Sequence, residues 1–445
     1  MAWFILPQEK LEIPAKNPNL VPMLMSLYQR LTKNATPLLE IYLKRRQKRG
    51  KEDPARTAER RGHSSRLREN KPLVWFHAAS VGESQALLIL IKQMLADYPG
   101  IQVMVTTGTV TSAKLMADRL PPGAFHQYMP VDQPDWTESF LNHWHPDFIV
   151  WSESEFWPNM LAGIRKRNIP AVLLNARMSE KSFQRWQMAR GMIGELLQAF
   201  RLCLGQSAAE ASRLRQLGAI EARASSNLKY AAAPLPFDAA QLDELKAALG
   251  SRPLVLWAQT HPGEEEIACR LHRQLQSVKP DVLTIIVPRH PDRGAAIAEL
   301  IAKAGIKASR RSLSQLPQKD DKIYIADTMG ELGLFYRLCR LCVVAGSFTW
   351  GGHNPIEPGQ LGCEIFYGPH MFNFETIAAE FESRGAALRV NDEAELEKNL
   401  ALALRDPAHF AALGQAAKAW TAQHADAAQE ISTVLAPFMK EIVAC

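Results

Sequence analysis

Residues 72–84 have the sequence PLVWFHAASVGES, and an amphipathic stretch that ends at Asp97 follows them. The short apolar run from Pro72 to His77 is typical of a buried β-strand. From Gln85 onward, apolar residues recur at helical spacing, namely Ala86, Leu87, Leu90, Ile91, Met94 and Leu95. A strand that leads through a glycine-containing turn into a helix is the first half of a βαβ unit, so we expect a parallel sheet.

The same alternation continues along the chain in two series. In the first series, the pattern predicts strands at 101–106, 147–151, 171–175 and 202–205, and helices at 111–120, 159–166 and 208–217. A short proline-containing linker at 231–236 and a helix at 239–249 interrupt it. In the second series, strands are predicted at 253–258, 282–287, 322–326, 341–345 and 364–367. The expected fold class is therefore α/β, with two doubly wound Rossmann-like domains.

The length of 445 residues suits two or three domains. We expect an N-terminal extension at 1–70, a first Rossmann-like domain at 71–230, a second at 231–425 and a C-terminal helix at 426–445. In doubly wound sheets, ligands bind beyond the carboxyl ends of the strands. Two facing domains would therefore hold the site in the cleft between them.

The N-terminal extension combines apolar and cationic residues. Apolar residues recur among polar ones from Met23 to Leu43, and residues 44–51 then contain six cations in eight positions. A helix of this composition suits the surface of an anionic membrane leaflet. A solvated basic linker after a docking helix explains the same composition. No stretch reaches the ~20 apolar residues that span a bilayer.

The overall charge and the cysteines restrict the class of protein further. The net charge of +6 favours anionic partners. The basic cluster at 44–51 lies outside both domains and lacks interleaved aromatic residues, which argues against nucleic acid. The six cysteines do not form a disulfide framework, and Cys339 and Cys342 have no second pair to complete a zinc site. This usage fits a reducing cytoplasm.

In the first domain, charged residues follow the predicted strands. Glu83 is expected in the first helical turn, where it either complements the helix N-terminus or removes a proton from a substrate hydroxyl. Glu153 and Glu155 follow the strand at 147–151, and we expect one of the two to be structural. Lys229 lies at the hinge, where it is either solvated or bound to an anionic ligand.

In the second domain, two segments after strands are suited to a nucleotide. Arg289 follows the strand at 282–287, and a guanidinium there can bind a phosphate or carboxylate through two hydrogen bonds. The segment 326–332 ends a strand and begins a helix, whose backbone N–H groups are available to a nucleotide.

The segment 345–358, AGSFTWGGHNPIEP, is the strongest of these signals. It places three glycines after a strand and then opens a helix with Asn354 and Pro355. Such a helix start attracts an anion, and Glu357 in its first turn is suited to ribose hydroxyls. The segment is neither a Walker loop nor the glycine fingerprint of NAD-binding domains, so it favours another nucleotide.

Nine segments stand in a distinctive order in this chain: HAASVGES (77–84), ESEFWPN (153–159), LLNARMSEKS (173–182), SNLK (226–229), THPGEEE (260–266), VPRHPDR (287–293), DTMGELG (327–333), GGHNPIEP (351–358) and GPHMFNF (368–374). Together they resemble the 3-deoxy-D-manno-octulosonic acid (Kdo) transferases of Gram-negative bacteria. The resemblance covers about residues 72–380 and implies the two-domain GT-B glycosyltransferase fold.

The resemblance also implies an activity and a location. The family moves Kdo from CMP-Kdo to a lipid A precursor of the lipid IVA type, with inversion, and uses no metal and no cofactor. It acts at the cytoplasmic face of the bacterial inner membrane, so we expect peripheral or N-terminal attachment to the membrane surface. Residues 71–230 would then bind the acceptor, and residues 231–425 would bind the CMP-sugar.

Site residues follow from the same resemblance. Glu83 corresponds to the general base, and Glu153 and Lys229 correspond to positions that stabilise the transition state. The residues expected to bind CMP are Pro288, Arg289, Met329, Gly330, Glu331, Asn354, Pro355, Ile356 and Glu357. Two alternatives stay open: another GT-B enzyme that uses a UDP-sugar, and a non-catalytic nucleotide- or membrane-binding protein. Binding of CMP rather than UDP, and the activity of Glu83→Ala, distinguish them.

Overall fold

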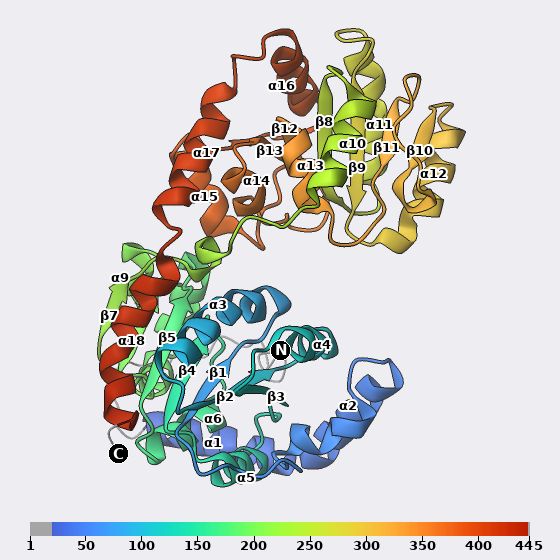
Figure 1. The fold of residues 1–445 in the computed structure, drawn as a ribbon. Coiled ribbons are helices and arrows are strands. Elements are labelled where there is room, and N and C mark those ends of the chain that lie inside the picture. Colours follow the sequence, from blue (N-terminus) through green and yellow to red (C-terminus); the bar gives the residue numbers. More distant parts are fainter. Residues whose placement is uncertain (1–19, 444–445) are drawn as a thin grey trace. The chain divides into compact units, whose positions relative to one another are not determined.

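The computed structural model describes residues 20–443 of the chain. The first 19 residues of the expected extension at 1–70 and the last two residues of the expected helix at 426–445 lie outside this range. The described chain divides into two compact units (Figure 1). The first unit comprises the residues up to Ala232 and those from Asp426 onward, and the second comprises Ala233–Ala425.

A parallel sheet forms the centre of the first unit, and seven strands of it lie within the described residues, in the order β3-β2-β1-β4-β5-β6-β7. All neighbouring strands pair in parallel, as the βα alternation predicted. The strands are β1 (Leu73–His77), β2 (Gln102–Thr107), β3 (Ala124–Tyr128), β4 (Phe148–Ser152), β5 (Ala171–Ala176), β6 (Leu202–Gly205) and β7 (Ala222–Ala224).

Helices cover both faces of this sheet, which explains the unbroken apolar run in β1. Leu73 and Trp75 join a core shared with α5, α6, α8 and α9, while Val74 and Phe76 join a core shared with α3, α4 and α18. A strand buried on both faces needs apolar residues at every position. The connecting helices are α3 (Val81–Asp97), α4 (Val110–Arg119), α5 (Pro134–Trp144), α6 (Pro158–Lys166), α7 (Glu180–Met188), α8 (Arg190–Leu197), α9 (Ala208–Leu217) and η3 (Leu228–Ala231).

The C-terminal helix α18 (Ala427–Val443) packs in the first unit, although it is the last described element in the sequence. The ring of Phe438 stacks on Phe148 of β4 with centroids 5.4 Å apart. Ile431, Leu435 and Met439 are buried in the core shared with α3. The first unit is therefore built from both ends of the described chain.

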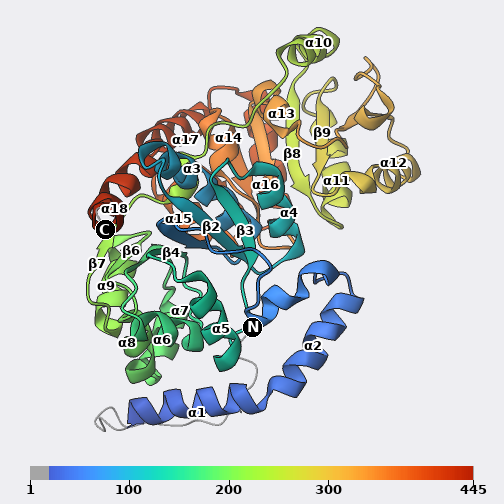
Figure 2. The same ribbon diagram turned by 60° about the horizontal axis from the view of Figure 1, so that its bottom comes forward.

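Helices α1 (Leu20–Asn34) and α2 (Thr36–Lys48) lie along the periphery of the first unit (Figure 2). The hydroxyl of Tyr28 donates to Asp132 Oδ2 at 3.0 Å, and the Arg61 guanidinium donates two hydrogen bonds of 2.6 Å to Glu40. These contacts fix one side of the two helices. Between residues 20 and 443, no helix has the length and apolar character to cross a bilayer.

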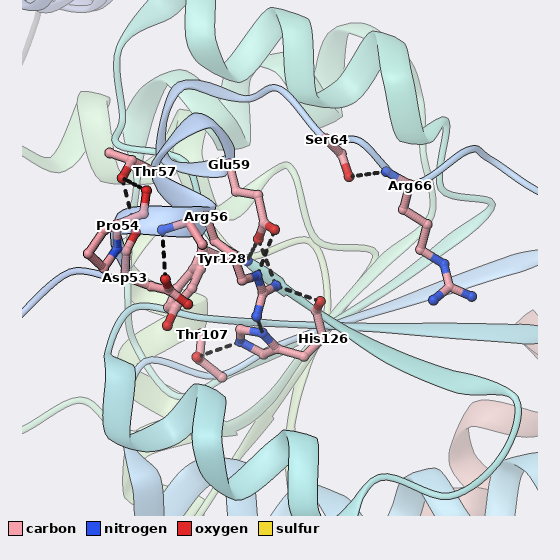
Figure 3. A network of polar contacts seen from close by, with 11 residues as sticks. Asp53, Pro54, Arg56, Thr57, Glu59, Ser64, Arg66, Thr107, His126 and Tyr128 are labelled. Carbon is pink, nitrogen blue, oxygen red and sulfur yellow. Dashed lines mark hydrogen bonds and ion pairs between the residues drawn. The ribbon is translucent and has the colours of Figure 1, made fainter.

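The short helix η2 (Pro54–Arg61) covers the outer edge of β3 (Figure 3). Arg56 Nη1 lies 3.0 Å from His126 Nδ1, and Arg56 Nη2 donates to the His126 carbonyl at 2.9 Å. Arg56 also pairs with Glu59 at 2.7 Å, and Glu59 Oε2 accepts the Tyr128 N–H at 2.7 Å. An open sheet edge invites association with other chains, so this cover protects β3.

The second unit contains another parallel sheet with seven strands in the described range, in the order β10-β11-β9-β8-β12-β13-β14. The strands are β8 (Leu254–Thr260), β9 (Leu283–Pro288), β10 (Ala308–Arg310), β11 (Ile323–Ile325), β12 (Leu341–Val344), β13 (Glu364–Tyr367) and β14 (Leu388–Arg389). The helices are α10 (Ala239–Leu249), α11 (Glu264–Gln276), η4 (Pro291–Arg293), α12 (Gly294–Lys303), η5 (Arg311–Leu313), α13 (Leu332–Leu338), α14 (Ile356–Gln360), α15 (Glu375–Ser383), α16 (Glu393–Arg405) and α17 (Ala411–Gln423).

Each sheet has one point at which the strand order reverses. In the first sheet, β1 lies between β2 and β4; in the second, β8 lies between β9 and β12. In open α/β sheets, ligands bind in the crevice beyond the carboxyl ends of the strands at such a switch point. The residues that follow β1 and β4, and those that follow β8 and β12, are therefore the first candidates for a site.

Candidate active site

Glu83 follows β1 and lies in the first turn of α3, which begins at Val81 rather than at the expected Gln85. The Ser80 hydroxyl caps this helix and accepts the Glu83 N–H at 3.3 Å. In return, Glu83 Oε2 accepts the Ala79 N–H at 2.8 Å. This arrangement is similar to a capping box. Glu83 therefore does stabilise the start of α3, and it uses Oε2 to do so.

The surroundings of Glu83 also raise the pKa of its carboxyl group. The residue is 7% exposed. Burial, followed by repulsion from Glu153, raises the pKa of Glu83 to about 7, although the hydrogen bonds with Ser80 and Ala79 oppose this change. A carboxyl group with a pKa near neutrality is more effective at accepting a proton at pH 7 than an ordinary glutamate.

Glu153 follows β4 and pairs with Lys229. The distance from Lys229 Nζ to Glu153 Oε1 is 2.9 Å, and the two side chains are 20% and 21% exposed. Glu153 has φ +57°, a left-handed conformation that few residues other than glycine adopt. Backbone strain of this kind occurs at functional sites. Glu83, Glu153 and Lys229 thus form one cluster at the switch point of the first sheet.

Glu155 is the second carboxylate of this segment and has different surroundings. Burial raises its pKa, and its charge adds a small repulsion at Glu83. The carbonyl group of Glu155 accepts the Trp151 indole N–H at 2.7 Å. Among the described residues, the ion pair at this strand end joins Glu153 to Lys229.

In the second unit, Glu264 holds the loop after β12 in place. Its Oε2 accepts the N–H groups of Gly346 at 2.7 Å and of His261 at 3.0 Å, and its Oε1 accepts that of Phe348 at 3.2 Å. Gly346 has φ +71°, and a Cβ atom there would lie 2.9 Å from the His353 ring. The loop therefore requires glycine at this position for both reasons.

Three aromatic rings stack beside this loop. The rings of His261 and His353 are nearly parallel, with centroids 5.1 Å apart and Nε2 atoms 3.0 Å apart. Trp350 stacks on His261 at 4.9 Å. Burial lowers the pKa of His353 to about 3 and also lowers the pKa of His261, so both rings are neutral at pH 7. The sequence did not reveal this stack, because its members lie about 90 residues apart.

Arg289 and Glu357 lie near each other at the carboxyl ends of the second sheet. Arg289 follows Pro288, the last residue of β9, and its guanidinium is exposed. Burial raises the pKa of Glu357 to about 7, although a hydrogen bond with the Asn354 side chain and the charge of Arg289 oppose this change. Glu357 Oε2 is a buried oxygen without a hydrogen-bond partner among the described atoms. A ligand hydroxyl would relieve the cost of leaving it unpaired.

The helix that follows Asn354 is a single short turn. Helix α14 begins at Ile356 and has five residues, and Pro355 precedes it with helical backbone angles. Asn354 Oδ1 accepts the Ile356 N–H at 3.1 Å. Asn354 therefore caps a single helical turn that carries Glu357.

The remaining nucleotide candidates precede α13. Met329 is 77% exposed, and Gly330 has φ +85°. The Glu331 carboxylate pairs with Arg311 at 2.6 Å and also accepts the Thr328 hydroxyl. The Arg311 guanidinium lowers the pKa of Glu331. The Glu331 side chain is thus engaged within the unit, and Met329 and the backbone of Gly330 are the accessible part of this segment.

The histidine, cysteine and acidic residues within 20–443 form no group of three or more that could hold a metal ion. Cys339 and Cys342, the pair noted in the sequence, are both buried thiols.

Two parallel, doubly wound units, each with one switch point, define the GT-B fold class. Anabaena Alr3699/HepE, solved in complex with UDP, aligns with 82% of this chain and 100% of its own, with a TM-score of 0.53 and 15% identity. A putative UDP-N-acetylglucosamine 2-epimerase from Listeria monocytogenes aligns with 83% of this chain and 97% of its own, with a TM-score of 0.55 and 13% identity. At such identities, the likeness concerns the fold alone.

Sequence relatives narrow the class to one family. Residues 55–232 match the family described as 3-Deoxy-D-manno-octulosonic-acid transferase (kdotransferase). The 3-deoxy-D-manno-octulosonic acid transferase of Rickettsia bellii is 34% identical over 384 residues, covering 86% of this chain and 91% of the relative. That of Bordetella pertussis is 32% identical over 415 residues, covering 90% and 96%. The chain belongs to the family of Kdo transferases, which are glycosyltransferases of lipopolysaccharide biosynthesis. The predicted family and fold class are confirmed.

Proposed function

We propose that this chain transfers Kdo from CMP-Kdo to a lipid A precursor of the lipid IVA type, with inversion of the anomeric centre and without a metal ion. In this proposal, the first unit binds the acceptor and supplies Glu83 as the general base. The second unit binds CMP-Kdo. The observation that carries the proposal is the position of Glu83 after β1 together with its pKa of about 7.

The chemistry of Glu83 fits a transfer to a sugar hydroxyl. An alcohol is a weak nucleophile at neutral pH, so removal of its proton during attack accelerates the reaction by about 10²–10⁴-fold. The Glu83 carboxylate takes that proton while the acceptor oxygen forms a bond to the anomeric carbon of Kdo. The bond from this carbon to the phosphate oxygen breaks, and CMP leaves with the electron pair. Attack on the face opposite CMP inverts the anomeric centre.

Glu153 and Lys229 are suited to the charges that develop during this step. Negative charge grows on the departing phosphate, and positive charge grows on the anomeric carbon. An ammonium and a carboxylate held 2.9 Å apart stabilise such a separated charge pattern when they are fixed before the reaction. We therefore assign both residues to transition-state stabilisation.

The second unit offers the groups that a cytidine monophosphate requires. The Arg289 guanidinium is suited to the phosphate. The unpartnered Oε2 of Glu357 is suited to a ribose hydroxyl, because a donor there would satisfy a buried acceptor. The remaining assigned contacts come from Pro288, Met329, Gly330, the backbone of Glu331, Asn354, Pro355 and Ile356.

The outer sides of α1 and α2 support attachment to a membrane surface. Their exposed apolar side chains are Leu27, Leu31, Leu38 and Ile41, at 46%, 48%, 69% and 47%. The exposed cations Lys44, Arg45, Lys48 and Arg49 follow directly. Apolar side chains beside cations favour an anionic bilayer surface over a solvated linker. We assign the enzyme to the cytoplasmic face of the inner membrane, where its lipid acceptor would be presented.

The direct test of this function is incubation of the purified full-length chain with CMP-Kdo and a tetraacylated lipid A precursor. We expect a product whose mass has increased by one or more Kdo units, and we expect an excess of EDTA to leave the rate unchanged. UDP-sugars should yield no product. Transfer from a UDP-sugar, or no transfer from CMP-Kdo under conditions in which CMP binds, would contradict the proposal.

A further inference from the structure

Three buried amide side chains lie beside Lys229, and the chemistry proposed above uses none of them. They are Asn175 in β5, Gln206 directly after β6, and Asn227 at the start of η3, with exposures of 4%, 9% and 3%. Burying an amide costs free energy unless its polar atoms are hydrogen-bonded. The hydrogen bonds of these amides therefore show which groups stabilise them in the interior.

The three residues form a closed ring of hydrogen bonds. Asn175 Nδ2 donates to Asn227 Oδ1 at 3.1 Å, and Asn227 Nδ2 donates to Gln206 Oε1 at 3.3 Å. Gln206 Nε2 closes the ring by donating to the backbone carbonyl of Asn175 at 3.0 Å. Because each amide is bound by the next, none can turn without breaking two contacts.

The acceptor oxygens of this amide ring bind the backbone that carries Lys229. Asn175 Oδ1 accepts the Leu228 N–H at 3.1 Å, and Asn227 Oδ1 accepts the Lys229 N–H at 3.0 Å. The ring thus fixes two consecutive peptide groups at the start of η3. A lysine side chain is long and flexible, so a fixed backbone restricts the positions that its ammonium can reach.

The same strand also holds the partner of Lys229. The Glu153 N–H donates to the carbonyl of Leu174, the residue before Asn175, at 2.8 Å. Asn175 has φ +54°, and Glu153 has φ +57°. A left-handed backbone is unfavourable for residues other than glycine, so the surrounding contacts must hold both residues in this conformation.

We propose that Asn175, Gln206 and Asn227 are positioning residues that hold the Lys229 ammonium against Glu153 for the transfer step. This inference rests on the proposed role of Lys229. If the amides act through Lys229, removing one of them should matter only while Lys229 is present. If the amides only stabilise the fold, removing one of them should slow transfer independently of Lys229. The fold-losses in rate of the two substitutions should then multiply in the double variant.

A double-mutant cycle on the full-length chain separates these possibilities. Single-turnover transfer from CMP-Kdo to a tetraacylated lipid A precursor is measured for Asn227→Ala, Lys229→Ala and the double variant. We expect Asn227→Ala to lower the single-turnover rate constant 10–100-fold, while the CMP-Kdo concentration that gives half of the maximal rate stays within twofold. We expect Asn227→Ala to cause no further loss in a chain that already contains Lys229→Ala. Asn227→Ser, which keeps an acceptor for the Lys229 N–H, should regain at least half of the lost activity on a logarithmic scale.

Asn159→Ala provides the matched control. Asn159 is also a buried amide of the first unit, but it binds Thr32 and the Asp132 carbonyl. In the Asn159→Ala background, Lys229→Ala should lower the transfer rate by the same factor as it does in the wild-type chain. If Asn227→Ala unfolds the chain, Gln206→Leu replaces it in the cycle, because Gln206 contacts the ring without binding the Lys229 backbone.

The outcomes test the positioning role of the amides separately from the proposed function. If Lys229→Ala slows transfer and its loss multiplies with that of Asn227→Ala, the positioning role is wrong and the proposed function stands. If Lys229→Ala transfers Kdo at the wild-type rate, the proposed role of Lys229 is wrong, and the inference is overturned with it.

Discussion

The ammonium group of Lys229 lies 2.9 Å from the Glu153 carboxylate, and that carboxylate in turn raises the pKa of Glu83. The protonation state of Glu83 therefore depends on residues 70 and more positions away in the sequence. This dependence makes pH a direct probe of the site, since only the deprotonated form of Glu83 can accept a proton.

The transfer rate should rise with pH through a midpoint of about 7, the pKa of Glu83. Below that pH the carboxyl is protonated and cannot act as a base, so the rate should fall about tenfold per pH unit. The measurement is kcat/KM for CMP-Kdo between pH 5 and 9 at constant ionic strength. A rate that is constant from pH 5.5 to 8 would contradict the role of Glu83.

Replacing Glu153 by Gln should move this midpoint to lower pH, because the substitution removes the repulsion that raises the pKa of Glu83. Its kcat at high pH should also fall, since the transition state loses a carboxylate. Glu155→Gln is the matched control, and its midpoint should move less, because Glu155 has the smaller effect on Glu83. The prediction fails if the Glu153→Gln midpoint stays in place or rises.

Glu83→Gln should stabilise the folded chain at high pH. Below about pH 4.5, Glu83 is protonated in both the folded and unfolded chain, so the substitution should change little. Above about pH 7 it is ionised in both, and the folded state then contains a charge that its surroundings disfavour. Since one pKa unit corresponds to about 1.4 kcal/mol, the gain at pH 8 should reach on the order of 3 kcal/mol.

Urea unfolding at pH 4.5 and pH 8 measures this gain in the free energy of unfolding. Glu180→Gln is a suitable control, because Glu180 is an exposed carboxylate in the first turn of α7. Its free energy of unfolding should change by a similar amount at both pH values. An equal effect of Glu83→Gln at the two pH values would show that the Glu83 pKa is not raised.

Arg289→Ala should weaken CMP binding by about 10–100-fold, since a hydrogen bond to a charged group contributes roughly 1.5–3 kcal/mol. Binding of cytidine, which lacks the phosphate, should change by less than threefold. Arg270→Ala is the control, because Arg270 is an exposed arginine of the same unit that pairs with Glu393. Calorimetric titration with CMP measures both variants. Equal losses of affinity for CMP and for cytidine would show that Arg289 does not bind the phosphate.

Leu38→Glu combined with Ile41→Glu should reduce binding to vesicles that contain anionic phospholipid by at least tenfold. The two substitutions place charges on the exposed apolar side of α2, which the proposed bilayer contact would have to bury. Ile220→Glu is the control, because Ile220 is 66% exposed in the first unit but lies outside α1 and α2. Co-sedimentation that is unchanged in the double variant would refute membrane attachment through these helices.

The central strands of the fold could be predicted because their sequences have a strong local pattern. β6 and β13 occupy the predicted residues, and β1 differs by one residue at its start. β3 was missed because its sequence, AFHQY, contains His126 and Gln127 and lacks an apolar run. β7 and β14 have three and two residues, which is too short for a periodic signal.

The candidate site was predictable as a set of positions and not as a set of contacts. The rule that ligands bind beyond strand ends pointed to Glu83, Glu153 and Arg289. The ring of Asn175, Gln206 and Asn227 could not be predicted, because each contact joins segments that become neighbours only after folding. The pairing of Glu331 with Arg311 was missed for the same reason, since an isolated glutamate before a helix carries no signal of its partner.

The most direct test of the central claim is the single-turnover rate of Kdo transfer by Glu83→Gln at pH 8, measured together with its affinity for CMP. We predict a rate at least 100-fold below that of the wild-type chain, since the amide cannot accept the hydroxyl proton. The dissociation constant of CMP should remain within twofold. Transfer at the wild-type rate by a variant that binds CMP normally would contradict the assignment of Glu83 as the base.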